Sequence, residues 1–208
     1  GVVAPVDGCW IDFNGDGQCQ DNEKIQKGTE KRPIDLPKDL TKTTIYGPIT
    51  YLNLNKTALT AIDLSKINTL KELWCYQTGI MELDVTGQTD LEKLFCHSNM
   101  IKKLDLSQNP KLRELGVQNS MLTAIDLSKL PELEVAVLSG NKLGTLDLTH
   151  NPKLRILYCE KTELTSLDLS KCPDLTFVQC SMNYDLKTVD LSMLPKLEVF
   201  KADLIGMK

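Results

Sequence analysis

A segment near the start of the chain has the residue types and spacing of a cation site. It places oxygen-bearing side chains at Asp12, Asn14 and Asp16, follows them with a glycine, and ends on Glu23. Alternation turns these oxygens toward one centre, the glycine permits a sharp turn, and the last carboxylate can bind with both oxygens. We therefore expect a calcium site, the alternative being a turn without metal. Its ligands would be Asp12, Asn14, Asp16, Gln18 through its main-chain carbonyl, and Glu23.

Two cysteines lie close to the acidic residues of this segment. Cys9 precedes it and Cys19 lies inside its second half. We expect a disulfide between them, which would indicate an oxidising compartment outside the cytoplasm. Two thiols are the alternative.

The rest of the chain is a tandem array. Each unit keeps six apolar positions in the pattern L-x-x-L-x-[L/C]-x-x-N-x-L-x-x-L-D-L-S. The apolar side chains of one such unit are too few to offset the entropy cost of ordering it, so the units must stack to fold. Units of 21 residues open at Ile49, Leu70, Leu91, Leu112, Leu133, Leu154 and Leu175, the last one residue longer, and a partial eighth unit opens at Leu197.

This pattern resembles the leucine-rich repeat. Cysteine at the [L/C] position (Cys75, Cys96, Cys159, Cys180) and the short L-D-L-S return resemble bacterial surface proteins of the internalin kind, especially those with a cysteine ladder. The segment 12–23 resembles an EF-hand calcium loop. These resemblances imply a leucine-rich repeat solenoid, mostly β in content, formed by residues 49–208 behind an N-terminal cap at residues 1–48.

In each unit we expect a strand at positions 3–7, forming a curved parallel sheet on the concave face. Short extended or 3-10 segments should form the convex return. The cap should contain short strands at 34–36 and 43–46. The asparagine column (Asn99, Asn141, Asn183) should satisfy backbone groups at the turn after the strand.

Side-chain alternation identifies a candidate ligand-binding face. Along each strand, the cysteine and leucine positions face the core, so the residues between them face outward. Exposed aromatic residues at this density indicate an interaction site, unless the strip covers itself. The candidate residues on the concave face are Tyr51, Trp74, Tyr76, Phe95, His97, Val137, Tyr158 and Phe177.

Several function classes fit poorly. A net charge of −4 argues against nucleic-acid binding, and no apolar run approaches the 18 or so residues that a membrane span requires. The two histidines, His97 and His150, are expected on different faces, and no catalytic motif is present, so we expect no enzymatic activity. The repeated aspartates from Asp63 to Asp190 are expected to bond locally, with a cation-binding strip as the alternative.

The resemblance implies a secreted or cell-surface bacterial protein that binds a protein ligand through its concave face. A carbohydrate-binding module that uses the same aromatic residues is one alternative, and a structural spacer is the other. The first residues, from Gly1 to Pro5, are compatible with a leader removed upstream and with a lipid anchor beyond them.

Overall fold

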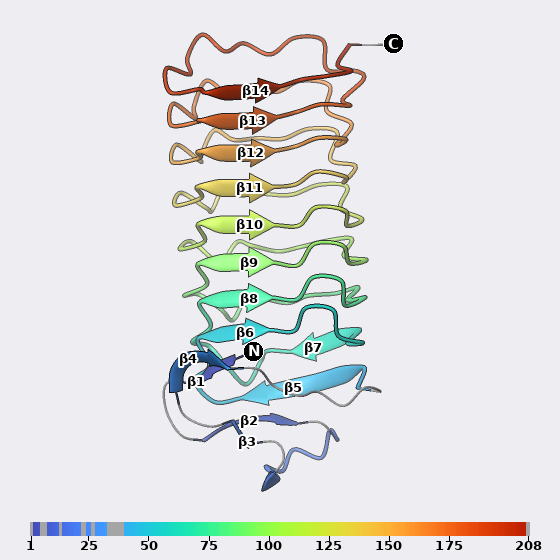
Figure 1. Cartoon of the computed structure of the whole chain (residues 1–208), viewed down its shortest axis with the longest axis vertical. Helices are drawn as coiled ribbons and strands as arrows, with labels where there is room; N and C mark the ends of the chain where they lie inside the picture. Colours follow the sequence, from blue (N-terminus) through green and yellow to red (C-terminus); the bar gives the residue numbers. More distant parts are fainter. Residues whose placement is uncertain are drawn as a thin grey trace.

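The computed structural model describes residues 2–4, 8–12, 14–21, 24–25, 28–32 and 40–206. They form a stack of turns in which each turn adds one short strand to a continuous sheet (Figure 1). This confirms the predicted fold class, a parallel β-solenoid, and the described residues include no α-helix. The parallel strands are β6 (Tyr51–Asn53), β8 (Glu72–Trp74), β9 (Lys93–Phe95), β10 (Glu114–Gly116), β11 (Val135–Val137), β12 (Ile156–Tyr158), β13 (Phe177–Gln179) and β14 (Val199–Lys201).

The register of this sheet equals the repeat length. Glu72, Leu73 and Trp74 pair with Lys93, Leu94 and Phe95, each 21 residues further along. The strands cover positions 3–5 of each unit instead of the predicted 3–7. The reason is that the chain begins to turn after position 5, although inter-turn bonds continue there: the Cys75 and Gln77 N–H groups donate to carbonyls of the next turn at 2.8 and 3.1 Å.

The core is one continuous column of apolar side chains. Leu73 and Leu94 are fully buried, and so are the ladder residues Cys75 and Cys96, as the alternation predicts. Burial raises the pKa of the Cys96 thiol to about 12. Because the thiolate is the reactive form, the ladder cysteines act as small apolar core residues.

N-terminal segments pair both with the first strand of the long sheet and with the first return strand of the solenoid. On the strand side, β1 (Val2–Ala4) pairs antiparallel with β6 and with β4 (Gly28–Arg32), so it covers the edge of the first repeat strand. On the return side, β3 (Lys24–Ile25), β2 (Cys9–Asp12), β5 (Lys42–Tyr46) and β7 (Ala61–Asp63) form a second sheet in that order.

In this second sheet, β5 corresponds to the strand predicted at 43–46. The strand predicted at 34–36 lies outside the described residues. The assignment of residues 1–48 as a separate cap stays a prediction.

After each strand the chain makes the same tight turn. Gln77 and Ser98 have φ of 53° and 55°, in the left-handed region that side chains other than glycine disfavour. The next residue stabilises the turn: the amide of Asn99 donates to the carbonyls of Cys75 and Cys96, and its oxygen accepts from the backbone N–H groups of Thr78 and Gly79. Each asparagine of the column therefore bonds its own turn to the one before it, and the asparagines occur in every second turn.

Replacing Asn99 with alanine should destabilise the solenoid by about 3 kcal/mol or more, because several buried backbone groups would lose their partner at about 1–3 kcal/mol each. Urea unfolding followed by circular dichroism measures the change. Ser120 provides the matched control: it occupies the same column, but its buried hydroxyl has no hydrogen-bond partner among the described residues, so Ser120→Ala should be nearly neutral. Equal effects of the two substitutions would contradict this role of the asparagine.

Candidate functional site

The outward side of the sheet carries paired aromatic rings. Trp74 stacks on Phe95 with ring centroids 4.2 Å apart and an interplanar angle of 17°. Tyr76 stacks on His97 at 4.3 Å and 11°. Because the register places residues 21 apart side by side, the structure brings these four predicted residues together on two neighbouring turns. We call this surface, with Tyr158 and Phe177 on β12 and β13, the aromatic sheet face.

A glycine sets the position of the Phe95 ring. Gly116 on β10 pairs with Phe95, and a Cβ built on it would lie 2.5 Å from Phe95 Cδ1. The ring therefore occupies the space that a side chain at position 116 would fill. The sequence did not lead us to expect that the Phe95 ring leans over Gly116. A glycine between aromatic and aliphatic residues in an outward column was the available signal.

The remaining predicted face residues lie on the same sheet. Tyr158 tilts against Phe177 with centroids 4.7 Å apart, and the Lys201 ammonium lies 5.9 Å from the Phe177 centroid. Val137 pairs with Tyr158 on the neighbouring strand. Tyr51 lies at the other end of the sheet, on β6, where its hydroxyl accepts from the Asn53 amide. All of these aromatic side chains are partly exposed.

A band of alternating charge borders this face. Along the edge of the sheet, cations lie beside anions of the preceding or the following turn. Examples are Lys71 with Glu92 at 3.3 Å and Lys153 with Glu132 at 2.6 Å. The charges of this band are therefore paired with one another.

The two histidines lie in different surroundings. Burial lowers the pKa of His97, which favours the neutral imidazole stacked on Tyr76. His150 lies in the return loop, where its Nδ1 is 3.0 Å from the Thr149 hydroxyl. The structure does not bring the two together.

In the predicted calcium loop, side-chain oxygens accept hydrogen bonds from backbone N–H groups of the same loop. The Asp12 carboxylate accepts from the N–H groups of Gly15 at 2.6 Å and Gly17 at 3.0 Å. Asp16 accepts from the Gln18 N–H at 2.7 Å, and the Asn14 amide is 3.0 Å from the Asp16 carboxylate. Asp12, Asn14 and Asp16 are thus close together, and carboxylate and amide oxygens are the donors that calcium prefers.

The closing ligand of that loop, Glu23, lies outside the described residues. Within the described part of the chain, no cluster of three or more histidine, cysteine or acidic side chains could hold a metal. The described ligands have suitable chemistry, and calcium binding stays a prediction. The same holds for the disulfide: Cys9 is buried on β2, whereas Cys19 is exposed in the loop.

Comparisons with known proteins agree on the fold. A domain of InlJ from Listeria monocytogenes that includes a cysteine ladder is 31% identical, with a TM-score of 0.59, over 75% of this chain and 44% of that one. The leucine-rich repeat protein LIC12759 from Leptospira interrogans is 22% identical, with a TM-score of 0.59, over 73% of this chain and 48% of that one. The leucine-rich repeat domain of APL1B is 18% identical, with a TM-score of 0.54, over 74% of this chain and 68% of that one.

The chain is therefore a leucine-rich repeat solenoid, and it is similar to an internalin with a cysteine ladder. It spans less than half the length of the InlJ and LIC12759 chains. Scans of protein-family models and of curated proteins find no match. Among the described residues, no helix has the length and apolar character to cross a lipid bilayer.

The aspartates of the return segments form a column with a shared role. In each turn the carboxylate accepts from the backbone N–H two residues later, as Asp126 does from Ser128 at 2.9 Å. This bond lowers the pKa of Asp126 and of its counterparts Asp105, Asp147 and Asp168. The local bonding predicted for this column is confirmed.

Acid should destabilise the solenoid through this column. A carboxyl whose pKa is lower in the folded state contributes stability above its unfolded value, near pH 4, and loses it as the pH falls through the folded value. The melting temperature should therefore stay level from pH 7 to 5 and fall below pH 4. Asp126→Asn keeps the acceptor oxygen but cannot titrate, so it should make this fall shallower. An identical acid profile for the variant would contradict the assignment.

Proposed function

We propose that this chain is a non-enzymatic binding protein that recognises a protein ligand through its aromatic sheet face. The carrying observation is the pair of partly exposed ring stacks, Trp74 on Phe95 and Tyr76 on His97. Aromatic residues dominate the energetics of protein interfaces because they bury large areas at low entropy cost. Here neighbouring turns hold the rings in place before any ligand arrives, which lowers the ordering cost of binding.

The charge pattern supports the same kind of ligand. Residues on the sheet edge are paired with one another, and on the face itself Lys93 pairs with Glu114 at 2.6 Å. A surface whose charges are internally paired attracts no strongly charged ligand. It favours a partner that buries apolar and aromatic side chains.

Ring geometry weighs against the glycan alternative. A sugar stacks on an exposed ring face, whereas each of these rings uses one face to contact its neighbour in the pair. Phe95 also leans over Gly116, which occupies part of its other side.

We propose an extracellular or bacterial cell-surface location. The similarity to an internalin domain from Listeria monocytogenes supports this proposal. So does the state of the ladder cysteines: deep burial keeps them protonated, which would protect them in an oxidising environment.

Substitutions can separate the binding face from the scaffold. Trp74→Ala and Phe95→Ala should leave the melting temperature nearly unchanged and weaken ligand binding by about 2 kcal/mol or more, since both rings lie on the surface. Leu94→Asp should unfold the array, because it places a charge in the fully buried core. Circular dichroism measures folding, and ligands captured from host-protein and glycan arrays provide the binding assay.

Three outcomes would argue against this function. Loss of folding in Trp74→Ala comparable to that in Leu94→Asp would place the tryptophan in the core. Selective capture of glycans would favour the carbohydrate alternative. Binding that no substitution on the aromatic sheet face changes would favour a structural spacer.

We also propose that the loop from Asp12 to Glu23 binds calcium and stabilises the N-terminal end of the solenoid. Asp12 ends β2, and its main-chain carbonyl accepts from the Thr43 hydroxyl of β5, so the loop is joined to the second sheet. Loops of this kind in extracellular modules bind at about 10⁻⁴ to 10⁻³ M, which suits the proposed location.

Calcium should raise the melting temperature, and chelation should reverse the change. Trp10 reports locally, because it stacks on Tyr46 at 4.0 Å and the Tyr46 hydroxyl lies close to Gly17 of the loop. In a Trp74→Phe background, calcium should change the Trp10 emission, and Asp16→Ala should abolish the response. Lys42→Ala, outside the loop, is the control. Identical melting curves in saturating calcium and in chelator would contradict calcium binding.

A further inference from the structure

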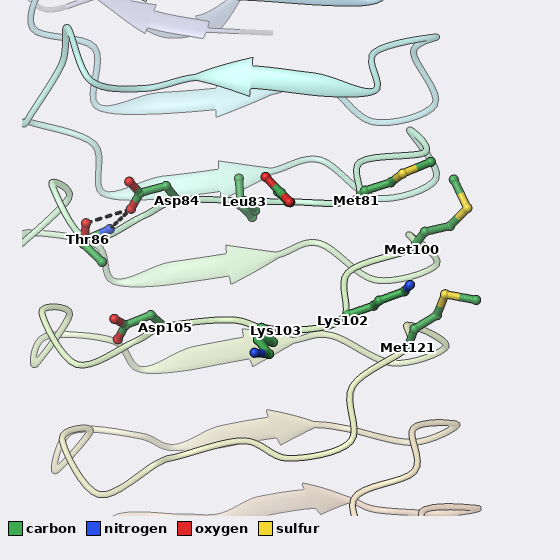
Figure 2. A pocket seen from close by; sticks show the side chains of 10 residues that line it. Met81, Leu83, Asp84, Thr86, Met100, Lys102, Lys103, Asp105 and Met121 are labelled. Carbon is green, nitrogen blue, oxygen red and sulfur yellow. Dashed lines mark hydrogen bonds between the residues drawn. The ribbon is translucent and has the colours of Figure 1, made fainter.

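A groove of about 920 Å³ lies on the return segments, away from the strands. Figure 2 shows it between the turn that contains Asp84 and the turn that contains Asp105. One end is formed by Met81, Met100 and Met121, whose exposed fractions are 56%, 39% and 53%. We call this surface the methionine groove. Exposed methionines that gather in one place mark an adaptable apolar binding surface.

The other end of the methionine groove carries the carboxylates of Asp84 and Asp105. At three other positions of the aspartate column a nearby lysine favours the charged form: Lys66 for Asp63, Lys129 for Asp126, and Lys171 for Asp168. Asp84 and Asp105 have no such partner, because Gly87 and Gln108 occupy the corresponding positions. The two carboxylates also repel each other across neighbouring turns. They therefore complement a cation brought by a ligand.

The main chain along the groove is also available. The backbone N–H and C=O groups of residues 81–84 and 102–105 form no hydrogen bond with any described part of the protein. In contrast, the first return strand, β7, pairs with β5. Extended segments with free donors and acceptors can bind the main chain of an extended peptide.

The remaining charges give the groove a direction. Lys102 lies on the methionine side, Lys103 lies between it and Asp105, and Asp84 lies on the opposite side (Figure 2). A basic side chain would be repelled by Lys102 and Lys103 and attracted by Asp84 at the far end. The two ends are three residues apart along the return segment, which is about 10 Å at roughly 3.3 Å per extended residue.

We propose that the methionine groove binds an extended peptide segment of a partner protein, in which a lysine or arginine lies three or four residues from apolar side chains. The basic side chain pairs with Asp84 and Asp105. The apolar side chains contact Met81, Met100 and Met121. This gives the solenoid a second interaction surface, independent of the aromatic sheet face.

Fluorescence anisotropy with a labelled degenerate peptide set tests the proposal. In this set one arginine precedes leucine or isoleucine by three or four residues, and control sets carry glutamate for the arginine or serine for the apolar residues. The basic-apolar set should bind saturably, and both control sets should bind at least tenfold more weakly. Raising the salt concentration should weaken binding, because one end of the groove acts through charge.

Matched variants locate the site. Asp105→Asn and the double variant Met100→Ser with Met121→Ser should each weaken binding at least tenfold. Asp126→Asn lies in the same column beside Lys129, and Met193 is 58% exposed outside the groove, so Asp126→Asn and Met193→Ser should bind as the unmodified protein does. Trp74→Ala should also bind normally. Circular dichroism confirms that each variant is folded.

The proposal is overturned if no peptide set binds saturably, or if the control variants lose binding as much as the groove variants. It is also overturned if the groove binds vesicles that contain anionic lipid while it fails to bind the peptides. Loss of peptide binding in Trp74→Ala would move the site to the aromatic sheet face.

Discussion

The structure depends on hydrogen bonds between turns that are offset by one repeat. No three-residue strand such as β9 is stable alone, since each turn obtains its partners only from the turns before and after it. The 21-residue period is thus a bonding constraint as well as a sequence pattern: one residue more or less in the strand would move every outward side chain to the core. The unit that opens at Leu175 tolerates its extra residue because the addition falls near Tyr184, after the strand.

The asparagine column compensates for the strain that this period imposes. A turn short enough to close in 21 residues puts one residue after the strand in the left-handed region. This occurs before the asparagine at Ser98 and Met182, and before Thr162 at Lys161, with φ of 55° to 58°. Because these residues carry side chains, the left-handed conformation destabilises the folded state by roughly 1–2 kcal/mol at each of them. The Asn183 amide offsets this strain by donating hydrogen bonds to the carbonyls of Cys159 and Cys180, which lie in two neighbouring turns.

Sequence alone predicted what repeats and missed what occurs once. The start of each strand, the buried cysteines and the local bonds of the aspartates all follow from a pattern seen many times, whereas the strands end two residues earlier than predicted. The pairing of Val3 with Tyr51 could not be predicted, because β1 comes from outside the repeats and pairs antiparallel. The lean of Phe95 over Gly116 needed three-dimensional neighbours, and the methionine groove combines Met81 and Met100 from different positions in their units.

The same constraint explains where binding surfaces can arise. Inward positions are fixed by stacking and turn positions by hydrogen bonding, so only outward columns can vary without cost to the fold. Where a column is regular, its charges neutralise one another between turns, as Glu132 and Lys153 do. Where regularity fails, at Gly116 on the sheet or at Gly87 and Gln108 on the return, a ring is repositioned or a carboxylate loses its cation. In a repeat protein, the departures from the pattern are therefore the places to look for recognition.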